Sequence, residues 1–546
     1  MDTPRRAGPR SFLFTRDKEL SAEAAEDYAI RKVPYHWKRS PASFVVVVFG
    51  VVTSVFAFAL GGQIALSYGM PTLVAALAIG FLIGAPLAAI VAWQTANSSI
   101  DSDLLSRGAG YGFMGSTVTA ALYGLNWIMY AGFECAFLGA AVHAQWESLP
   151  LWLLYAVAAA VLVPLNWYGV SQMHWIQKWT VPLFFAGLIW LLIEALGKPA
   201  VELPDVGVSA GTLLPALAAV LGNVAIWILL VGDFARFARK EDRRTVVTLT
   251  VIVAMGGEFL FLALLGGLLA KHTGSANPGA YAVGLMGVPG LLWVLVTQMR
   301  VQEGNYYSGS LSLVNFSARV LHWMPGRRFF VIVVAAAAFL LAQLKIVDHL
   351  TQVLTFMAVF LFAWVGTMVY SLLGRRRLLQ RGEVWVEHRR GYLRDWGWPA
   401  VAGLFAGSAV GVPLALSGDP EPYGGFLGIA IAFLLAPAVF AALDLLLVRD
   451  PQYLIARVPE PDWRDTNART DRELEDPAMQ VVCGTCGSEV MKPDALTCPV
   501  TPGGVICSAC CQSHATCRDV CKTPEGTSKL AQLQGAEGRD RPLERA

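Results

Sequence analysis

Apolar segments long enough to cross a lipid bilayer run from residue 43 to residue 447, and they constrain the fold more than any other feature. Each is close to or longer than the roughly 20 mostly apolar residues that a helix needs to span the hydrocarbon core. Only 15% of the 546 residues are charged, whereas a soluble domain carries about 25%. The expected fold class is therefore an all-α polytopic membrane protein. We predict about twelve spans, near residues 43–66, 71–94, 112–144, 150–168, 179–197, 212–233, 246–270, 289–314, 329–345, 350–373, 397–417 and 423–447.

Basic residues beside these segments indicate how the chain is oriented. They precede the first span and follow the sixth, eighth and tenth: Arg31, Lys32, Lys38, Arg39, Arg236, Arg239, Lys240, Arg243, Arg244, Arg319, Arg327, Arg328, Arg375, Arg376, Arg377, Arg381, Arg389, Arg390 and Arg394. Cytoplasmic loops are enriched in lysine and arginine, and twelve spans put all these connections on one side. We therefore expect a plasma (inner) membrane protein with both termini cytoplasmic, a polar N-terminal tail over residues 1–42 and no cleavable signal peptide. The net charge of +2 gives no indication of a nucleic-acid partner.

A few ionisable residues lie inside the predicted spans. Glu134 is in the third, Glu258 in the seventh, and Arg300 and Glu303 are in the eighth. Such groups cost several kcal/mol at mid-membrane depth unless they are paired or face water. Two interpretations stay open at this point: a buried structural ion pair, or a pathway for a substrate or a proton.

Aromatic and amide neighbours of these acids favour a binding site. Trp127, Tyr130 and Glu134 are spaced to lie along one face of a helix. A ring beside a carboxylate suits a flat ligand with N–H donors, because the rings stack and the carboxylate accepts hydrogen bonds. The polar stretch 297–305 cannot face lipid and must line a cavity or a neighbouring helix. Gly222-Asn223 in the sixth span could form an unwound turn.

The segment from Gly232 to Arg239 carries a family resemblance. Its Asp233 and Arg236 resemble the aspartate–aromatic–x–arginine signature that closes the sixth helix of nucleobase–cation symporters, the cytosine/purine permease and hydantoin transporter family. Other stretches occur in matching order over roughly residues 25–450: Asp27-Tyr28, Val33-Pro34, Gly61-Gly62 with Leu66-Ser67-Tyr68, Leu104 through Gly112, Asn305 through Asn315, and Arg375–Arg377. The glycine pair Gly61-Gly62 could instead serve close helix packing.

This resemblance implies a LeuT-like fold of two inverted five-helix repeats plus two helices, with spans one and six broken at mid-membrane. It places the ligand between spans one, three, six and eight. By position, Tyr130 matches a stacking aromatic, Glu134 a hydrogen-bonding residue one turn later, and Asn305 an amide that contacts ligand. The expected substrate-binding residues are Trp127, Tyr130, Glu134, Asn223, Gln302 and Asn305.

The chain departs from the family pattern at two positions. Val224 stands where some relatives carry a stacking aromatic, and Arg300-Val301 stands where small hydroxyl residues help to hold sodium. A guanidinium there would repel a sodium ion. We therefore expect sodium-independent transport, driven by protons or by exchange, with Glu134, Glu258 or Glu303 as proton carriers. Alternatively, Arg300 faces the cytoplasmic vestibule.

A cysteine-rich segment follows the last span. Its candidate metal ligands are Cys483, Cys486, Cys498, Cys507, Cys510, Cys511, His514, Cys517 and Cys521. Paired CxxC motifs about twenty residues apart are typical of zinc sites, so we expect one or two zinc ions, with Cys483, Cys486, Cys507 and Cys510 as one site. Disulfides and an iron–sulfur cluster are the rival interpretations. The expected divisions are a charged linker at 448–480, a cysteine-rich module at 481–522 and a disordered tail at 523–546.

These features favour a secondary transporter that imports a nucleobase or a similar small heteroaromatic solute. Two alternatives stay open: a membrane sensor that binds solute and signals through the cysteine module to a cytoplasmic protein partner, and an amino-acid or amine carrier of the same fold. The spans contain no nucleophile–base set, and Cys135 is isolated within them. We therefore do not expect an enzyme.

Overall fold

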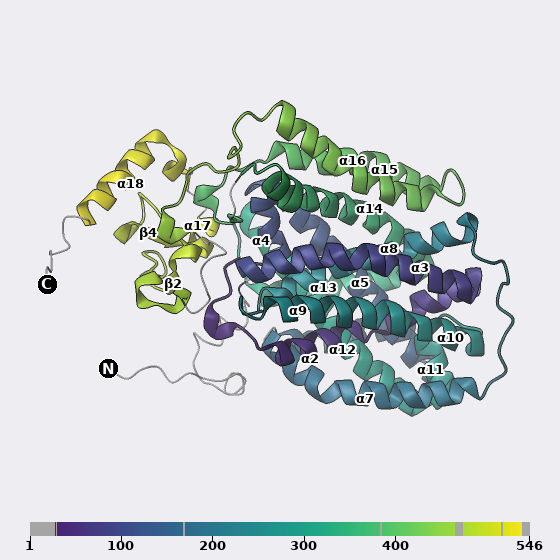
Figure 1. Cartoon of the computed structure of the whole chain (residues 1–546). Coiled ribbons are helices and arrows are strands. Elements are labelled where there is room, and N and C mark those ends of the chain that lie inside the picture. Colours follow the sequence, from purple (N-terminus) through teal and green to yellow (C-terminus); the bar gives the residue numbers. More distant parts are fainter. Residues whose placement is uncertain are drawn as a thin grey trace.

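The computed structural model describes residues 28–537 except 29, 168–169, 383–384, 465–472 and 515–516. Long, roughly parallel and antiparallel helices form its main body, and a small module lies beyond one end of this bundle (Figure 1). The described start of the chain reaches the same end as the module (Figure 1). Asp27, most of the expected N-terminal tail and the last residues, 538–546, lie outside the described residues.

Every predicted span contains helix in the structure. The elements from the start of the chain to the end of the bundle are η1 Tyr35–Trp37, α2 Pro41–Val52, α3 Val55–Ser98, α4 Ser102–Ser106, η2 Arg107–Tyr111, α5 Ser116–Gln145, α6 Leu151–Val161, η3 Pro164–Asn166, α7 Val170–Leu196, α8 Ala210–Ala235, α9 Arg243–Leu249, η4 Thr250–Leu262, α10 Ala263–Thr273, α11 Pro278–Met286, α12 Val288–Val320, α13 Arg327–Gln343, η5 Ile346–His349, α14 Leu350–Val369, η6 Tyr370–Leu378, η7 Arg390–Tyr392, α15 Trp398–Ser417 and α16 Gly424–Leu446. By length and composition, eight helical segments of the described chain can cross a membrane. The number twelve therefore stays a prediction.

Polar caps fix several helix starts. Ser40 precedes Pro41 at the start of α2, and Ser209 forms a capping box with Thr212 at the start of α8. These side chains satisfy backbone N–H groups that have no partner within the helix. Gly69 interrupts α3 with a φ of 82° and a ψ of 164°, so the first two predicted spans are separate helical stretches.

The break expected in span one lies between α2 and α3. Thr53 Oγ1 donates to the carbonyl oxygen of Gly50 over 3.0 Å, and Ser54 Oγ accepts from the backbone N–H of Phe56 over 2.9 Å. The break is therefore several residues before Gly61-Gly62. A side chain at Gly61 would collide with the backbone of Ala263 in α10, so this pair serves close packing.

The break expected in span six is not found. α8 runs without interruption through Gly222 and Asn223. A side chain at Gly222 would collide with Leu354 of α14, so the glycine is needed for helix packing instead. The polar group at this depth is the Asn223 side chain and not an unwound backbone.

Two groups of packed helices surround the centre of the bundle. α3 packs against α8 and α10, whereas α5 packs against α12 and α13. α15 and α16 pair with each other and cover α14 on one side of the bundle (Figure 1). The centre is therefore enclosed by α2, α3, α5, α8 and α12, the elements that carry the predicted site.

The module after the bundle is built from short elements. They are η8 Pro461–Trp463, η9 Glu473–Glu475, η10 Pro477–Met479, β1 Gln480–Val482, β2 Glu489–Met491, η11 Lys492–Asp494, β3 Ala495–Thr497, η12 Pro502–Gly504, β4 Val505–Cys507, α17 Ser508–Ser513, η13 Val520–Lys522 and α18 Pro524–Glu537. β1 pairs with β2 and β3 with β4, both antiparallel.

Two expectations about the ends of this module need amendment. α18 is helical from Pro524 to Glu537, so the described part of the expected disordered tail has regular structure. The expected linker is in part attached to the bundle: the N–H of Ala456 donates to the carbonyl of Tyr392 over 2.8 Å. Linker residues 465–472 lie outside the described residues.

Candidate functional site

A small cavity lies at the centre of the bundle, beside the break between α2 and α3. Its volume is about 30 Å³, room for one or two water molecules but far less than the several hundred Å³ of a typical ligand pocket. Binding of an aromatic solute therefore requires these side chains to move apart. The lining residues are Val51, Ser54, Phe56, Trp127, Tyr130, Glu134, Asn223, Ile226, Trp227, Leu230, Glu258, Val301 and Asn305.

The Glu134 carboxylate joins three elements at this cavity. Ser54 Oγ, at the helix break, donates to Glu134 Oε1 over 2.7 Å. Gln298 Nε2 of α12 donates to Glu134 Oε2 over 2.7 Å and to the Glu134 carbonyl oxygen over 2.8 Å. Each carboxylate oxygen therefore accepts a hydrogen bond from a neighbouring element. Sequence reasoning missed the role of Ser54, because the position of the break sets it.

A second hydrogen-bonded chain crosses the cavity from α5 to η4. The Tyr130 hydroxyl donates to Asn223 Oδ1 over 3.1 Å, and Asn223 Nδ2 donates to Glu258 Oε1 over 2.8 Å. Glu258 Oε2 is buried and has no hydrogen-bond partner among the described residues. Glu258 lies in the π-helical stretch η4, and such stretches occur frequently at functional sites. Its second oxygen is therefore available to a proton, water or ligand.

Aromatic rings form the walls of the cavity. The rings of Phe56 and Tyr130 are 5.0 Å apart between centroids, and the indoles of Trp127 and Trp227 also line the space. Val224 does not line the cavity. Trp227 supplies an aromatic wall one turn further along α8, on the same face as Asn223. Sequence reasoning missed it, although its spacing from Asn223 was the available signal.

Of three further predicted residues, one lines the cavity and two lie outside it. Asn305 lines the cavity, whereas Gln302 does not; Gln302 Nε2 donates to the Ala131 carbonyl over 2.8 Å, and its Oε1 accepts from Asn305 over 3.1 Å. Glu303 also lies away from the cavity, where its Oε2 accepts from Gln177 Nε2 over 3.1 Å.

Arg300 is fully buried beside the end of α2 and not in the cavity. Its Nη2 donates to the Gly50 carbonyl over 2.8 Å, and its Nε donates to Gln177 Oε1 over 3.0 Å. The guanidinium also lies 5.0 Å from the centre of the Phe184 ring. A cation at the C-terminal end of a helix is favourable, because carbonyl groups there lack helical partners.

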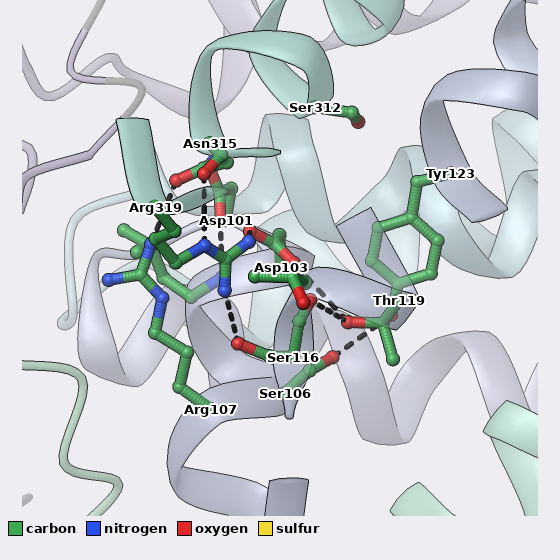
Figure 2. Close-up of polar contacts among 12 residues, drawn as sticks. Asp101, Asp103, Ser106, Arg107, Ser116, Thr119, Tyr123, Ser312, Asn315 and Arg319 are labelled. Carbon is green, nitrogen blue, oxygen red and sulfur yellow. Dashed lines mark hydrogen bonds and ion pairs between the residues drawn. The ribbon is translucent and has the colours of Figure 1, made fainter. Parts of the chain in front are cut away.

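A buried polar cluster closes the end of the bundle nearest the cysteine module. We call it the module-side network; its members are Asp101, Asp103, Arg107, Arg236, Tyr307, Asn315 and Arg319, none more than 3% exposed. Figure 2 shows Arg319 against Asp103, 2.8 Å apart between Nη2 and Oδ2. Arg236 Nη2 donates to the Tyr307 hydroxyl over 2.7 Å, which joins α8 to α12. The neighbouring Asp233 accepts from the N–H of Ser102 over 3.4 Å.

Comparison with protein families identifies this arrangement. The family described as permeases for cytosine/purines, uracil, thiamine and allantoin matches residues 36–434. The chain belongs to this permease family. The match covers the helical bundle up to α16, and the cysteine module lies beyond it. No protein in the curated set matches.

Solved structures show that the permease has the fold of known transporters. Mhp1, a nucleobase-cation-symport-1 family transporter in a closed conformation with bromovinylhydantoin bound, is 18% identical with a TM-score of 0.59, over 77% of this chain and 96% of that one. Its inward-facing conformation is 17% identical with a TM-score of 0.58, over 76% and 93%. A Na⁺-coupled sialic acid symporter is 12% identical with a TM-score of 0.53, over 78% and 95%. The permease is therefore a multi-pass membrane protein of the expected LeuT-like fold.

The permease also contains a candidate metal centre. Cys483, Cys486, Cys507 and Cys510 place all their sulfur atoms within 4.8 Å of one another. Tetrahedral ligation with Zn–S bonds of about 2.3 Å places sulfurs roughly 3.8 Å apart, and Cys486 Sγ is 4.0 Å from Cys507 Sγ. All nine cysteines of the permease are described and have free thiols. The four sulfurs can therefore hold a metal ion.

The other predicted ligands do not form a second centre of this kind within the described residues. They are Cys498, Cys511, His514, Cys517 and Cys521. Cys498 and Cys511 belong to the apolar core of the module, and Cys521 Sγ lies 4.0 Å from the carbonyl oxygen of Gly391. Among the described residues the structure thus shows one close group of four sulfur ligands, and a second ion stays a prediction.

Proposed function

We propose that this permease imports a nucleobase or a related small heteroaromatic solute across the plasma membrane, with both termini in the cytoplasm. The observation that carries the proposal is the central cavity, where two carboxylates, Glu134 and Glu258, lie among four aromatic rings. The family to which the chain belongs and the hydantoin-bound relative agree with it. An amino-acid or amine carrier is the alternative, because a carboxylate would also hold a cationic amine.

The proposed recognition combines stacking with hydrogen bonds. The rings of Tyr130, Trp127 and Trp227 offer flat apolar surfaces, and the free oxygen of Glu258 accepts from ring N–H groups. The side-chain amide of Asn305 offers both a donor and an acceptor for exocyclic groups. Because the cavity is small in this conformation, we propose that the solute enters as the two packed helix groups separate.

Tyr130→Ala is the test of the stacking site. We expect it to weaken solute binding by about 1–3 kcal/mol, the range found when an aromatic that stacks on a base is removed. Tyr130→Phe is the matched control, because it keeps the ring and loses only the hydrogen bond to Asn223. Uptake of labelled uracil, cytosine, purines and hydantoins into proteoliposomes measures both variants. Unchanged transport by Tyr130→Ala would place the site elsewhere.

We propose that transport is independent of sodium and coupled to protons. Arg300 donates to the Gly50 carbonyl at the helix break, so a positive charge is present beside carbonyl groups that could otherwise attract a cation. Of the three acids considered, Glu258 lines the cavity and keeps a free oxygen, which favours it as the proton carrier.

A sodium gradient is expected to leave uptake unchanged at fixed pH, whereas an inward proton gradient is expected to raise it. Proteoliposomes loaded with matched potassium or sodium buffers separate the two gradients. Sodium-driven uptake at fixed pH would contradict the proposal. A protein that binds solute without any accumulation would instead be a sensor.

We propose that the four-cysteine centre binds one zinc ion. Sulfur ligands and tetrahedral spacing support zinc over harder cations. Metal analysis of the purified permease is expected to give one zinc per chain, and Cys507→Ser should lower this severalfold. Cys135→Ser, far from the centre in α5, is the control and should not change it. Two zinc ions per chain, or an iron–sulfur absorption spectrum, would contradict the proposal.

A further inference from the structure

The short helix α17 carries metal ligands and docking residues together. Cys507 caps its start and Cys510 lies in its first turn, and both belong to the four-cysteine group. Two positions later, Gln512 is 2% exposed and its Oε1 accepts from Arg107 Nη1 of the bundle over 2.8 Å. The same six-residue helix therefore touches the metal centre and the membrane domain.

Arg107 connects this contact to the module-side network. Its Nη2 donates to Asn315 Oδ1 of α12 over 2.9 Å, and Figure 2 shows the two side chains together with Asp101. Asn315 Nδ2 in turn reaches Asp101 Oδ2 over 3.5 Å. Asp101 and Arg236 approach within 3.7 Å, which continues the network to α8. A short chain of polar contacts thus links α17 to both helix groups.

Further contacts hold the module against the bundle. Arg389 Nη1 donates to the Ala495 carbonyl over 2.6 Å, and Arg31 Nε is 3.2 Å from Asp494 Oδ2. Burial acts to raise the pKa of Asp494, but a hydrogen bond from His388 and the charge of Arg31 hold it below its usual value. Asp494 Oδ1 also accepts from Ser508 Oγ of α17 over 2.7 Å. The docked module is thereby bonded to the start of the chain and to the loop after α14.

We propose that the cysteine module is a metal-responsive latch, in which a soft divalent cation on the four cysteines fixes α17 and, through Gln512 and Arg107, holds the module-side network closed. A six-residue helix is unstable by itself, and metal binding supplies folding energy to modules too small for a large core. Alternating access requires the two helix groups to separate at this end. Loss of the metal therefore releases Arg107 Nη1 from Gln512, leaving it the longer contact of 3.4 Å to the His388 carbonyl, and favours opening.

The test follows amide hydrogen exchange in the full-length permease in lipid nanodiscs, with Zn²⁺ or with a zinc chelator. The informative segments are Leu229–Ala235 of α8 and 303–311 of α12, which lie beyond the residues that contact the module in the hydrogen bonds above. Chelation is expected to speed exchange there roughly 10- to 100-fold, because hydrogen bonds to charged groups are lost. By linkage, opening of this end should weaken zinc binding by the same factor.

Gln512→Ala separates the latch from simple unfolding of the module. With zinc bound at wild-type stoichiometry, this variant is expected to show the fast exchange of the chelated protein. Ser513→Ala is the matched control, since within the described part of the chain Ser513 Oγ bonds to carbonyls of its own helix, those of Ala509 and Cys510. If chelation changes only amides of the module, or if Gln512→Ala with zinc exchanges like wild type, the latch is wrong. Neither readout needs a transported solute, so the result is independent of the proposed transport function.

Discussion

Arg319→Ala is expected to lower the free energy of unfolding by about 3–5 kcal/mol, because it leaves a buried carboxylate without its cation. Asp103 is 3% exposed, and after the loss of Arg319 its carboxylate still accepts from Thr119 Oγ1, over 3.3 Å. Arg319 also donates through Nε to the Asn315 carbonyl over 2.9 Å, so the end of α12 loosens as well. Equilibrium unfolding in detergent measures the change.

Two further variants decide whether the buried pair causes this loss. Arg319→Ala combined with Asp103→Asn should recover part of the stability, because the uncompensated charge is removed. Arg377→Ala is the control, since Arg377 is an exposed arginine at the same end of the bundle. Equal losses from Arg377→Ala and Arg319→Ala, or no recovery in the double variant, would show that the pair has no special role.

Glu258→Gln is expected to abolish proton-driven accumulation while leaving exchange of solute across the membrane intact. The glutamine amide keeps an oxygen that accepts from Asn223 Nδ2. Its NH₂ group takes the place of Glu258 Oε2, which has no hydrogen-bond partner among the described residues, so folding should be retained. A one-unit pH gradient can sustain up to about tenfold accumulation per proton, and this ratio should fall to about one. Accumulation and counterflow of labelled solute in proteoliposomes measure the two activities separately.

Glu134→Gln is the comparison for that prediction. Both oxygens of Glu134 accept hydrogen bonds. In Glu134→Gln the new NH₂ group replaces one of these acceptors, so it faces either the Ser54 hydroxyl or the Gln298 amide, which also donate. We expect reduced affinity or stability, by about 1–3 kcal/mol, with proton coupling preserved. Accumulation by Glu258→Gln at the wild-type ratio would exclude Glu258 as the proton carrier.

Much of the central site could be predicted from the sequence. Tyr130 and Glu134 share a helix face, and carboxylates at membrane depth need partners or water, which predicts a shared site. In the structure Tyr130, Glu134 and Glu258 all line the cavity. Trp227 and Ser54 were missed, because their roles depend on the rotation of α8 and on where α2 ends. The spacing of residues along one helix shows which of them share a face. The place where a helix breaks, and the way a helix is rotated, depend instead on the helices packed against it.

The module shows the same division. The CxxC spacing sufficed to predict the group formed by Cys483, Cys486, Cys507 and Cys510. Spacing could not predict that Gln512 meets Arg107, since the two residues are 405 positions apart and no local pattern joins them. Nor could spacing predict the contact made by Arg389, which was expected in the basic connection after the tenth span. Its guanidinium donates to the Ala495 carbonyl of the module.

The sequence by itself determined the membrane-spanning helical bundle and the four cysteines of the candidate metal centre. In the hydrocarbon core a backbone group has no water to bond to, so each span must form a helix that satisfies its own N–H and carbonyl groups. Paired cysteines at this spacing are typical of zinc ligands, so the candidate centre follows from the spacing of the cysteines. Only the tertiary structure decided that α8 is unbroken, that Arg300 lies at the end of α2 and that the module closes over the module-side network. These features depend on contacts between distant segments, and packing alone sets which side chains meet.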